Sequence, residues 1–499
     1  MTEKVTKPRQ RKKKETVKNQ EGAGAVANVP KPKPARPRIQ IVKQEPTDAP
    51  TPLPLAVVRQ PLASTPNNPQ LEGEDAIRSI RFHYKLPMLY QPSQAEAYES
   101  AFISHFVELN RTVRSASQET PWVSQIPGLH RRATKPALKL SIRAASMAFY
   151  AQVHQEPSIL TDSYRWYTMS LNTQRAALSK LDRDAIPDEE ELLVPIILGL
   201  YEVYAGTTPT SVFQHLTAAT RIFALRGPRN MASGVANTLL KAIRISDAHK
   251  AVMFNQPSVL STPEWMTLPF VLSPKNAHQL LNDVVLQIPA CIALSGLKGS
   301  LGDVFTRDIA PGTDLGPVRE RTAQLIQNLD DWADKYPHLC EAKPGTQVVA
   351  LDMGIYKSPT SPQTPASPSL MLPGTFIALI AASYNATRLI LTLLQQKISS
   401  FDLDPTPTTA VPHPMTPIQS PNLGATLKAV KFSQTILAIA SYLESTHPVG
   451  FDFMRSVFPL VCVAALGPRP EDQNVAKEML VRWGTSRGVG GLCGAWRQN

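Results

Sequence analysis

The chain has 499 residues, of which 42% are apolar, enough for one or two substantial cores with long segments left outside them. The formal net charge is +12, but residues 1–43 hold 13 Lys/Arg against 3 Asp/Glu, so the rest of the chain is close to neutral. Four cysteines, the first of them Cys291, are too sparse for a disulfide framework and favour a reducing compartment. The N-terminus lacks the apolar run of a signal peptide, which argues against secretion.

A compact cationic run stands near the N-terminus. It comprises Lys7, Arg9, Arg11, Lys12, Lys13 and Lys14. Such a run attracts nuclear import receptors and phosphate backbones alike. We expect nuclear import, with nonspecific DNA contact or a solvated tail without a special role as the alternatives. A looser basic segment at 31–38 has an Arg-Pro-Arg core like that of a minor-groove hook, but lacks the glycine beside it.

The next segment is rich in proline. Residues 30–69 contain 11 prolines and few aromatic residues, so little apolar surface is available to offset chain entropy. We therefore expect residues 1–72 to form a disordered basic and Pro-rich tail. Within it, Val42-Lys43-Gln44-Glu45 matches a sumoylation acceptor pattern, which makes Lys43 a candidate for modification.

From residue 73 onward the apolar spacing is that of helices. Two examples are the stripes Tyr164, Tyr167, Leu171, Leu178 and Leu181, and Val212, Leu216, Ala219 and Phe223. No convincing set of strands and no repeat of fixed period is present. The predicted fold class is all-α: an irregular multi-helix array with a disordered basic N-terminal tail and Pro-rich inserts.

Local signals place several helix ends. Asp188 followed by Glu191 predicts a capping box at a helix start, and Pro195 should kink or restart the helix that follows. Arg226-Gly227-Pro228 predicts a helix stop, with a left-handed glycine. A lone His215 on an apolar helix is expected to be a core or boundary residue. Glu202 is expected to pair with a nearby base, with effector binding as the alternative.

The segment from Tyr164 to Pro228 carries an ordered series of features. An amphipathic helix and an acidic start at 188–191 lead into an apolar helix. Then follow Tyr201, Glu202, His215, Leu216, Arg226, Gly227 and Pro228. This series resembles the regulatory domain downstream of the binuclear zinc cluster in fungal-specific transcription factors. With Leu325, Leu329 and Trp332, the similarity covers residues 75–495. It implies an all-helical, non-catalytic regulatory domain of a nuclear protein, in which these seven residues are structural.

The chain departs from that family in its DNA-reading part. The family's cluster needs six closely spaced cysteines for two zinc ions, and no cysteine of this chain precedes Cys291. Zinc-dependent base readout is therefore not expected from these residues. DNA contact would come from the basic tail, from a partner, or from a zinc cluster that lay upstream of Met1 in a longer gene product.

An enzyme hypothesis rests on Asp330-Asp331-Trp332-Ala333-Asp334. This is the Asp-Asp-x-x-Asp pattern with which helical terpene synthases bind magnesium and diphosphate. The second metal motif expected downstream is absent, and Asn282-Asp283 lies upstream without further oxygen ligands. We favour an exposed acidic helix face whose Trp332 points into the core.

Two Pro-rich inserts interrupt the helical body. The expected division is a first helical part at 73–342, a disordered Ser/Thr-Pro insert at 343–372, and a second helical part at 373–499 with a loop at 402–423. Candidate phosphorylation sites in the first insert are Ser358, Ser361, Thr364 and Ser367. The most apolar stretch of the second part, Phe376 to Leu394, contains Arg388, so a buried core helix is expected rather than a membrane span.

The C-terminal segment from Gly484 to Gly491 is rich in glycine, and we expect a mobile turn there. No Gly-x-Ser-x-Gly elbow, His-Glu-x-x-His motif or phosphate loop with its lysine is present. The sequence thus predicts a nuclear transcription regulator rather than an enzyme, with no cofactor, no metal site and no membrane contact. Its expected partners are DNA, other transcription regulators and a second copy in a homodimer. The alternatives are a magnesium-dependent enzyme of terpene-synthase type and a helical scaffold protein without a transcriptional role.

Overall fold

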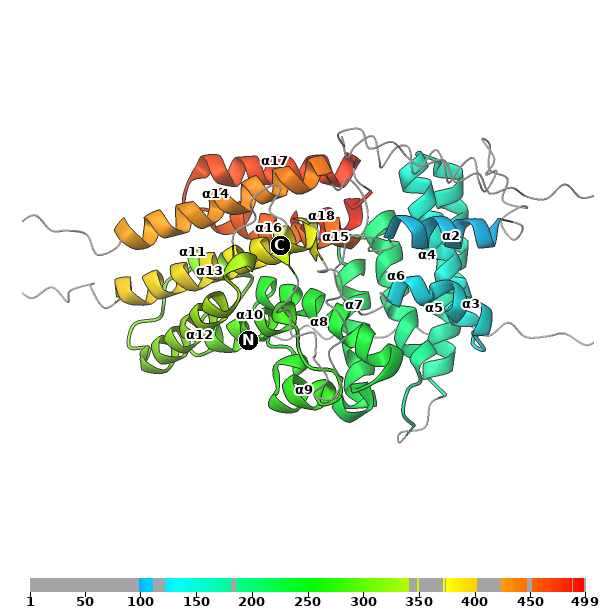
Figure 1. Ribbon diagram of the computed structural model, residues 1–499, viewed down its shortest axis with the longest axis horizontal. Helices are drawn as coiled ribbons and strands as arrows, with labels where there is room; N and C mark the ends of the chain where they lie inside the picture. Colours follow the sequence, from blue (N-terminus) through cyan, green and yellow to red (C-terminus); the bar gives the residue numbers. More distant parts are fainter. Residues whose placement is uncertain are drawn as a thin grey trace, which may run out of the picture. The chain divides into compact units, whose positions relative to one another are not determined.

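The computed structural model describes residues 98–110, 122–180, 185–340, 348–349, 371–372, 374–401, 423–446, 451–486 and 488–497. All of them belong to one compact unit, Ser64–Asn499. Most of these residues are helical, which confirms the all-α fold class (Figure 1). The only strands among them are β1 (Val348–Val349) and β2 (Met371–Leu372).

The first half of the described chain contains these helices: α2 (Glu99–Asn110), η2 (Trp122–Gln125), α3 (Ile126–Arg132), α4 (Pro136–His154), α5 (Pro157–Leu178), α6 (Glu189–Ala205), α7 (Ser211–Arg226), η3 (Pro228–Met231), α8 (Gly234–Met253), η4 (Val259–Ser261), α9 (Pro263–Thr267) and η5 (Leu268–Phe270). The second half contains α10 (Ala277–Ala293), α11 (Leu301–Thr306), α12 (Gly316–Lys335), η6 (Pro337–Leu339), α13 (Gly374–Phe401), α14 (Leu423–Thr446), α15 (Phe451–Arg455), α16 (Val457–Leu466), α17 (Pro470–Ser486) and α18 (Gly490–Arg497).

One apolar core joins the two halves. Its buried residues run from Phe102 on α2 to Trp496 on α18. In the first half α4 is the central helix and packs against α2, α5 and α6. In the second half α13 packs against α12, α14 and α16, and α10 contacts both α8 and α12. The inserts therefore interrupt the sequence without dividing the core.

Helix α13 contains the apolar stretch predicted to be a core helix. Its segment Phe376–Phe401 is long and apolar enough to cross a membrane. However, 83% of the most apolar 18-residue stretch of this segment is buried inside the protein. Its Arg388 forms an ion pair with Asp330 of α12. The helix thus supplies core packing in this structure.

The apolar stripe predicted on α5 departs from the buried face at one described residue, since Leu171 and Leu178 pack against the core. Tyr167 is buried, but Tyr164 of the same predicted stripe is 52% exposed. The buried face also carries Ser170 and Gln174, and the Ser170 hydroxyl donates to the carbonyl oxygen of Ala137 at 2.7 Å. Because the Ser170 hydroxyl and the Gln174 amide N–H each donate to a backbone carbonyl oxygen of a neighbouring helix, these side chains can occupy core positions that hydropathy assigns to the surface.

Helix α6 begins as predicted, and it does not restart at Pro195. Asp188 accepts from the backbone N–H of Glu191 at 2.9 Å, and the Glu191 carboxylate accepts from the backbone N–H of Asp188, which completes the capping box. The helix runs through Pro195 to Ala205 without restarting. Gly206 ends it in the left-handed region at φ +59°.

The glycine-rich C-terminal segment differs from its prediction. Gly484 belongs to α17 and Gly490 begins α18, which packs against α6, α7 and α17, so both ends of the segment are helical. At Gly491 the backbones approach so closely that a Cβ would overlap the carbonyl oxygen of Glu202 and lie 2.9 Å from the Cα of Gly206. Glycine here allows two helix ends to touch, a role that the local sequence does not reveal.

The Ser/Thr-Pro insert lies almost wholly outside the described residues. Only its edges are described, where β1 and β2 pair antiparallel, with Val348 opposite Leu372 and Val349 opposite Met371. Most of the expected loop at 402–423 and the whole tail at 1–72 also lie outside the described residues.

Candidate functional site

Two of the residues that carry the family resemblance, Tyr201 and His215, form a buried cluster with Tyr167 where α5, α6 and α7 meet. Tyr201 stacks on Tyr167, with ring centroids 4.4 Å apart. The Tyr167 hydroxyl and Nε2 of His215 are hydrogen-bonded at 2.9 Å. Burial, followed by the charge of Arg175, lowers the pKa of His215 to about 4, and burial raises the pKa of Tyr201 to about 12. At neutral pH both side chains are therefore uncharged members of the core.

Glu202 lies fully buried beside this cluster. Its carboxylate accepts from the backbone N–H of Thr207 at 3.0 Å and from the Thr207 hydroxyl at 2.6 Å. These contacts join the end of α6 to the turn before α7. We predicted that Glu202 pairs with a basic residue, whereas in the structure its carboxylate is hydrogen-bonded to Thr207.

The end of α7 is fixed by the predicted helix stop. Arg226 donates to the carbonyl oxygen of Pro187 at 2.6 Å and thereby links the end of α7 to the start of α6. Gly227 has φ +80°, and Pro228 begins η3. Leu216 is the exception among the motif residues, because it faces a cavity rather than the closed core.

A cavity of about 260 Å³ lies among helices from both halves of the fold. Helices α6, α7, α8, α10, α16 and α18 contribute to its walls, together with Trp122 of η2 and the adjoining Met454 and Arg455 of α15. Helix α8 presents one face to it. That face consists of Thr238, Lys241, Ala242, Ile245, Ser246 and His249, at helical spacing. The site exists only because these distant segments pack together.

Two buried histidines line the cavity. His249 and His278 are each 7% exposed, and neither imidazole has a hydrogen-bond partner within the described segments. His249 stacks on Phe458 with ring centroids 4.0 Å apart, and His278 meets Phe376 edge to face. Burial lowers the pKa of both histidines to about 3, with smaller contributions from nearby Arg455. Both are neutral at pH 7, and each can donate one hydrogen bond and accept another.

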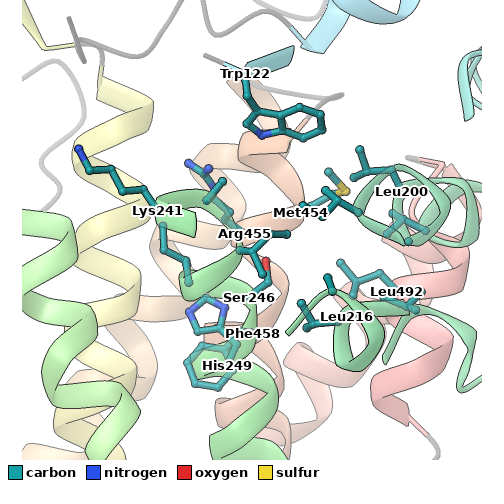
Figure 2. A pocket seen from close by; sticks show the side chains of 18 of the residues that line it. Trp122, Leu200, Leu216, Lys241, Ser246, His249, Met454, Arg455, Phe458 and Leu492 are labelled. Carbon is teal, nitrogen blue, oxygen red and sulfur yellow. The ribbon is translucent and has the colours of Figure 1, made fainter. Parts of the chain in front are cut away.

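Two cationic side chains line the same cavity. Lys241 is buried and donates to the hydroxyl of Ser273 at 2.7 Å. Arg455, the last residue of α15, is partly buried. In Figure 2 the charged ends of both side chains point to the left of the view, whereas Leu200, Leu216 and Leu492 lie on the right. The cavity thus has a cationic side and an apolar side.

The lining is mostly apolar, with a smaller number of polar and cationic side chains. None of its residues within the described segments is Asp, Glu, Cys or Tyr. No three His, Cys, Asp or Glu side chains of the described residues are grouped so that they could hold a metal ion. The site provides apolar contact, two cations, two neutral imidazoles, and hydroxyl and amide groups such as those of Ser246 and Asn276.

The Asp-Asp-x-x-Asp segment lies on α12, away from this lining. Asp330 pairs with Arg388, and Asp331 accepts from the amide of Gln327 at 2.8 Å. Trp332 points into the core as predicted, donating to the carbonyl oxygen of Ala277 at 2.8 Å. The carboxylates of Asp330 and Asp331 thus make contacts with the protein itself.

The predicted cationic run and modification sites lie outside the described residues. They are Lys7, Arg9, Arg11, Lys12, Lys13, Lys14, Lys43, Ser358, Ser361, Thr364 and Ser367. Sequence reasoning missed the cavity residues Lys241, His249, His278 and Arg455. The available signal was the run of polar residues at helical spacing on α8, which the sequence alone does not distinguish from a solvated face.

Comparison of the whole chain with models of protein families, with curated proteins and with solved structures gives no match in any of the three. The fold and the cavity describe the protein as far as its class: it is an all-α protein whose helical body contains a mostly apolar cavity with two cationic side chains in its lining.

Proposed function

We propose that this chain is a nuclear transcription regulator of fungal type whose helical body is a non-catalytic regulatory and protein-interaction domain controlled by a small molecule. The observation that carries the proposal is the cavity, in which two buried imidazoles have no hydrogen-bond partner among the described residues. Buried polar groups are normally hydrogen-bonded, so a ligand that bonds them would stabilise the domain. Ligand-dependent stability is one means by which a regulatory domain responds to its effector.

Two features of the sequence support the regulatory role. The ordered series from Tyr164 to Pro228 resembles the regulatory domain of fungal-specific transcription factors. The cationic run at 7–14 suits nuclear import and contact with DNA phosphates. On this proposal, sequence-specific DNA contact comes through a partner regulator, the domain pairs with other regulators or with a second copy, and the tail adds nonspecific affinity.

The alternative, a magnesium-dependent enzyme of terpene-synthase type, has less support. Asp330 is paired with Arg388, and Asp283 is paired with Arg244 and Lys275. Carboxylates used in this way would have to break ion pairs before binding magnesium. The scaffold hypothesis differs from ours only in location and DNA contact, so the same experiments address it.

The test is a gel-shift and footprinting titration of the full-length protein on random duplex DNA across a salt series. A second protein lacks residues 1–43, and a third carries Ala at the six cations of the 7–14 run. A control carries Ala at the four cations of the looser segment at 31–38. We expect weak, steeply salt-dependent binding that is lost with residues 1–43, and a salt slope reduced by about five when the six cations are removed.

Two outcomes would replace this proposal. A sequence-selective footprint that survives deletion of residues 1–43 would mean that the helical body itself reads DNA. Magnesium-dependent turnover of a prenyl diphosphate, abolished by Asp331→Ala, would make the protein an enzyme. In cells, a fluorescent fusion should enter the nucleus and lose that localisation when the 7–14 run is neutralised; exclusion of the unmodified fusion from the nucleus would favour the scaffold hypothesis.

A further inference from the structure

Several polar side chains around the cavity already have partners in the protein. Lys241 donates to the hydroxyl of Ser273, which lies outside the lining, at 2.7 Å, and Arg455 also has a partner. The Asn276 side chain accepts from the backbone N–H of Gln279 at 3.0 Å. The Gln279 side-chain amide in turn donates to the backbone carbonyl oxygen of Lys241 at 2.8 Å. Since the protein itself uses these groups, the two cations give no reason to expect a charged ligand.

The two histidines of the lining differ from these side chains. His249 and His278 are each 7% exposed and have no hydrogen-bond partner in the part of the chain that the structure describes. Phe458 and Phe376 contact the imidazole rings, one each. His278 also lies close enough to His249 to lower its pKa, so one ligand group can lie near both. Because buried polar groups are normally hydrogen-bonded, the two imidazoles indicate where a ligand is held.

The hydrogen-bonding capacity of the imidazoles selects the ligand group. Both histidines are uncharged at neutral pH, so each has one ring nitrogen that donates and one that accepts. A hydroxyl has the same combination, and one hydroxyl can accept from the N–H of one histidine while it donates to the ring nitrogen of the other. A carbonyl oxygen can only accept. A carboxylate can also only accept, and it would bring a charge into a mostly apolar cavity at a cost in desolvation.

The rest of the ligand would meet apolar side chains. Leu216 of α7 and Leu492 of α18 lie to the right of His249 in Figure 2, with Leu200 of α6 above them. A hydroxyl compound without an apolar body would leave these leucines in contact with water. The lining therefore favours a mostly apolar molecule with one polar group that fixes its orientation.

The volume limits the size of the ligand. A cavity of about 150 Å³ is enough for one benzene molecule. The 260 Å³ found here then has room for about ten non-hydrogen atoms. Ser246 on the α8 wall is exposed and marks a side from which the cavity meets solvent.

We propose that the cavity binds an uncharged hydroxyl compound with an apolar body and about ten non-hydrogen atoms in total. The hydroxyl lies between His249 and His278, accepts from one imidazole N–H and donates to the ring nitrogen of the other. The apolar body lies against the three leucines. The role of this ligand as an effector rests on the proposed function, whereas its binding is a property of the cavity alone.

The first experiment compares three probes of similar size by isothermal titration calorimetry on the full chain. Para-propylphenol carries the hydroxyl, propylbenzene lacks it, and para-ethylbenzoate has a carboxylate in its place. We expect para-propylphenol to bind at least about ten-fold more tightly than propylbenzene, equivalent to about 1.4 kcal/mol, although propylbenzene is the more hydrophobic of the two. Para-ethylbenzoate should bind more weakly than para-propylphenol. A smaller preference over propylbenzene, equal or tighter binding of para-ethylbenzoate, or no binding of para-propylphenol at millimolar concentration would overturn the proposal.

Histidine variants locate the hydroxyl. His249→Phe and His278→Phe keep an aromatic ring at each position and remove its nitrogens. Each should lower the affinity for para-propylphenol about five-fold, because one hydrogen bond is lost, without lowering that for propylbenzene. The control His338→Phe on η6 replaces a half-buried histidine outside the lining and should leave both affinities as they were. Circular dichroism checks folding, and an unchanged preference for para-propylphenol in either folded cavity variant would exclude the shared hydroxyl site.

NMR of the histidine side-chain nitrogens tests the same contacts in the unmodified chain, and it decides the question if the cavity variants do not fold. Para-propylphenol should shift the ring-nitrogen signals of two histidines, and propylbenzene should shift them much less. Equal shifts with both probes would mean that the hydroxyl does not reach the imidazoles.

The outcomes also separate this inference from the proposed function, because no DNA is present in these measurements. Binding of para-propylphenol by a chain without nuclear or DNA activity would refute only the regulatory proposal. Nuclear and DNA activity without binding of para-propylphenol would refute only this inference.

Discussion

The side-chain amide of Gln174 on α5 donates to the backbone carbonyl oxygen of Glu191 on α6 at 3.2 Å. In an uninterrupted helix this carbonyl would accept from the N–H of residue 195. Residue 195 is a proline, which has no N–H to give. Gln174 thus takes the place of the missing helical donor and lets α6 continue through Pro195.

This relationship predicts the effect of removing the amide. Gln174→Met keeps the apolar stem but leaves the buried carbonyl without its donor, so the free energy of unfolding should fall by about 1–2 kcal/mol. Urea denaturation of the two proteins measures the change. In a Pro195→Ala background the helical N–H is restored, and Gln174→Met should cost clearly less. The same loss in both backgrounds would mean that Gln174 does not compensate for the proline.

Because α18 contacts the end of α6, substitution of Gly491 and of Gly494 should change the free energy of unfolding in opposite directions. A Cβ at Gly491 would meet the backbone at Glu202 and Gly206, whereas one at Gly494, a turn further along α18, meets nothing within 4 Å. Gly491→Ala should lower the free energy of unfolding by about 1–3 kcal/mol, because backbone must move. Gly494→Ala should raise it by about 0.5–1 kcal/mol through helix propensity. Thermal and urea unfolding of both variants provide the measurement, and equal behaviour of the two would contradict the close approach.

The buried histidines predict how stability depends on pH. Burial, then His278 and Arg455, lower the pKa of His249 to about 3 in the folded chain, below the ordinary value of 6.5. Between these values the unfolded chain binds more protons, so the free energy of unfolding must fall as the pH falls, by up to about 1.4 kcal/mol per pH unit for each such histidine.

Urea unfolding between about pH 7 and pH 5 measures this slope. His249→Gln should reduce the slope by about one proton. Phe458→Leu, which loses only the stacking partner of His249, should lower stability at every pH and leave the slope as it is. If His249→Gln has the slope of the unmodified protein, His249 is already protonated in the folded state or is not buried there.

Several features of the fold follow from short stretches of sequence. The capping box at Asp188 and Glu191, the helix end at Arg226, and the inward position of Trp332 are all as predicted. Each depends on residues within one or two helical turns, or on one large apolar side chain, so the information is local. The buried α13 was also predictable, because an apolar helix interrupted by Arg388 suits a core with an ion pair better than it suits lipid.

The features that were missed depend on neighbours far along the chain. On α5, Tyr164 is exposed and Gln174 is buried. Gln174 can be buried because its side-chain amide donates to the backbone carbonyl oxygen of Glu191 on α6. Gly491 must be glycine because the end of α6 lies directly against the first turn of α18. His249, His278, Lys241 and Arg455 are ordinary polar residues in the sequence, and only packing places them around one cavity.

By itself, the sequence determined the helical class, the start of α6, the end of α7, and the concentration of positive charge in residues 1–43, because periodicity, capping and charge density are local properties. Only the tertiary structure decided which polar residues are buried, how α6 passes through Pro195, and where a ligand could bind. The burial of a side chain depends on what other segments place against it, and a cavity is the space that several distant helices together leave unfilled.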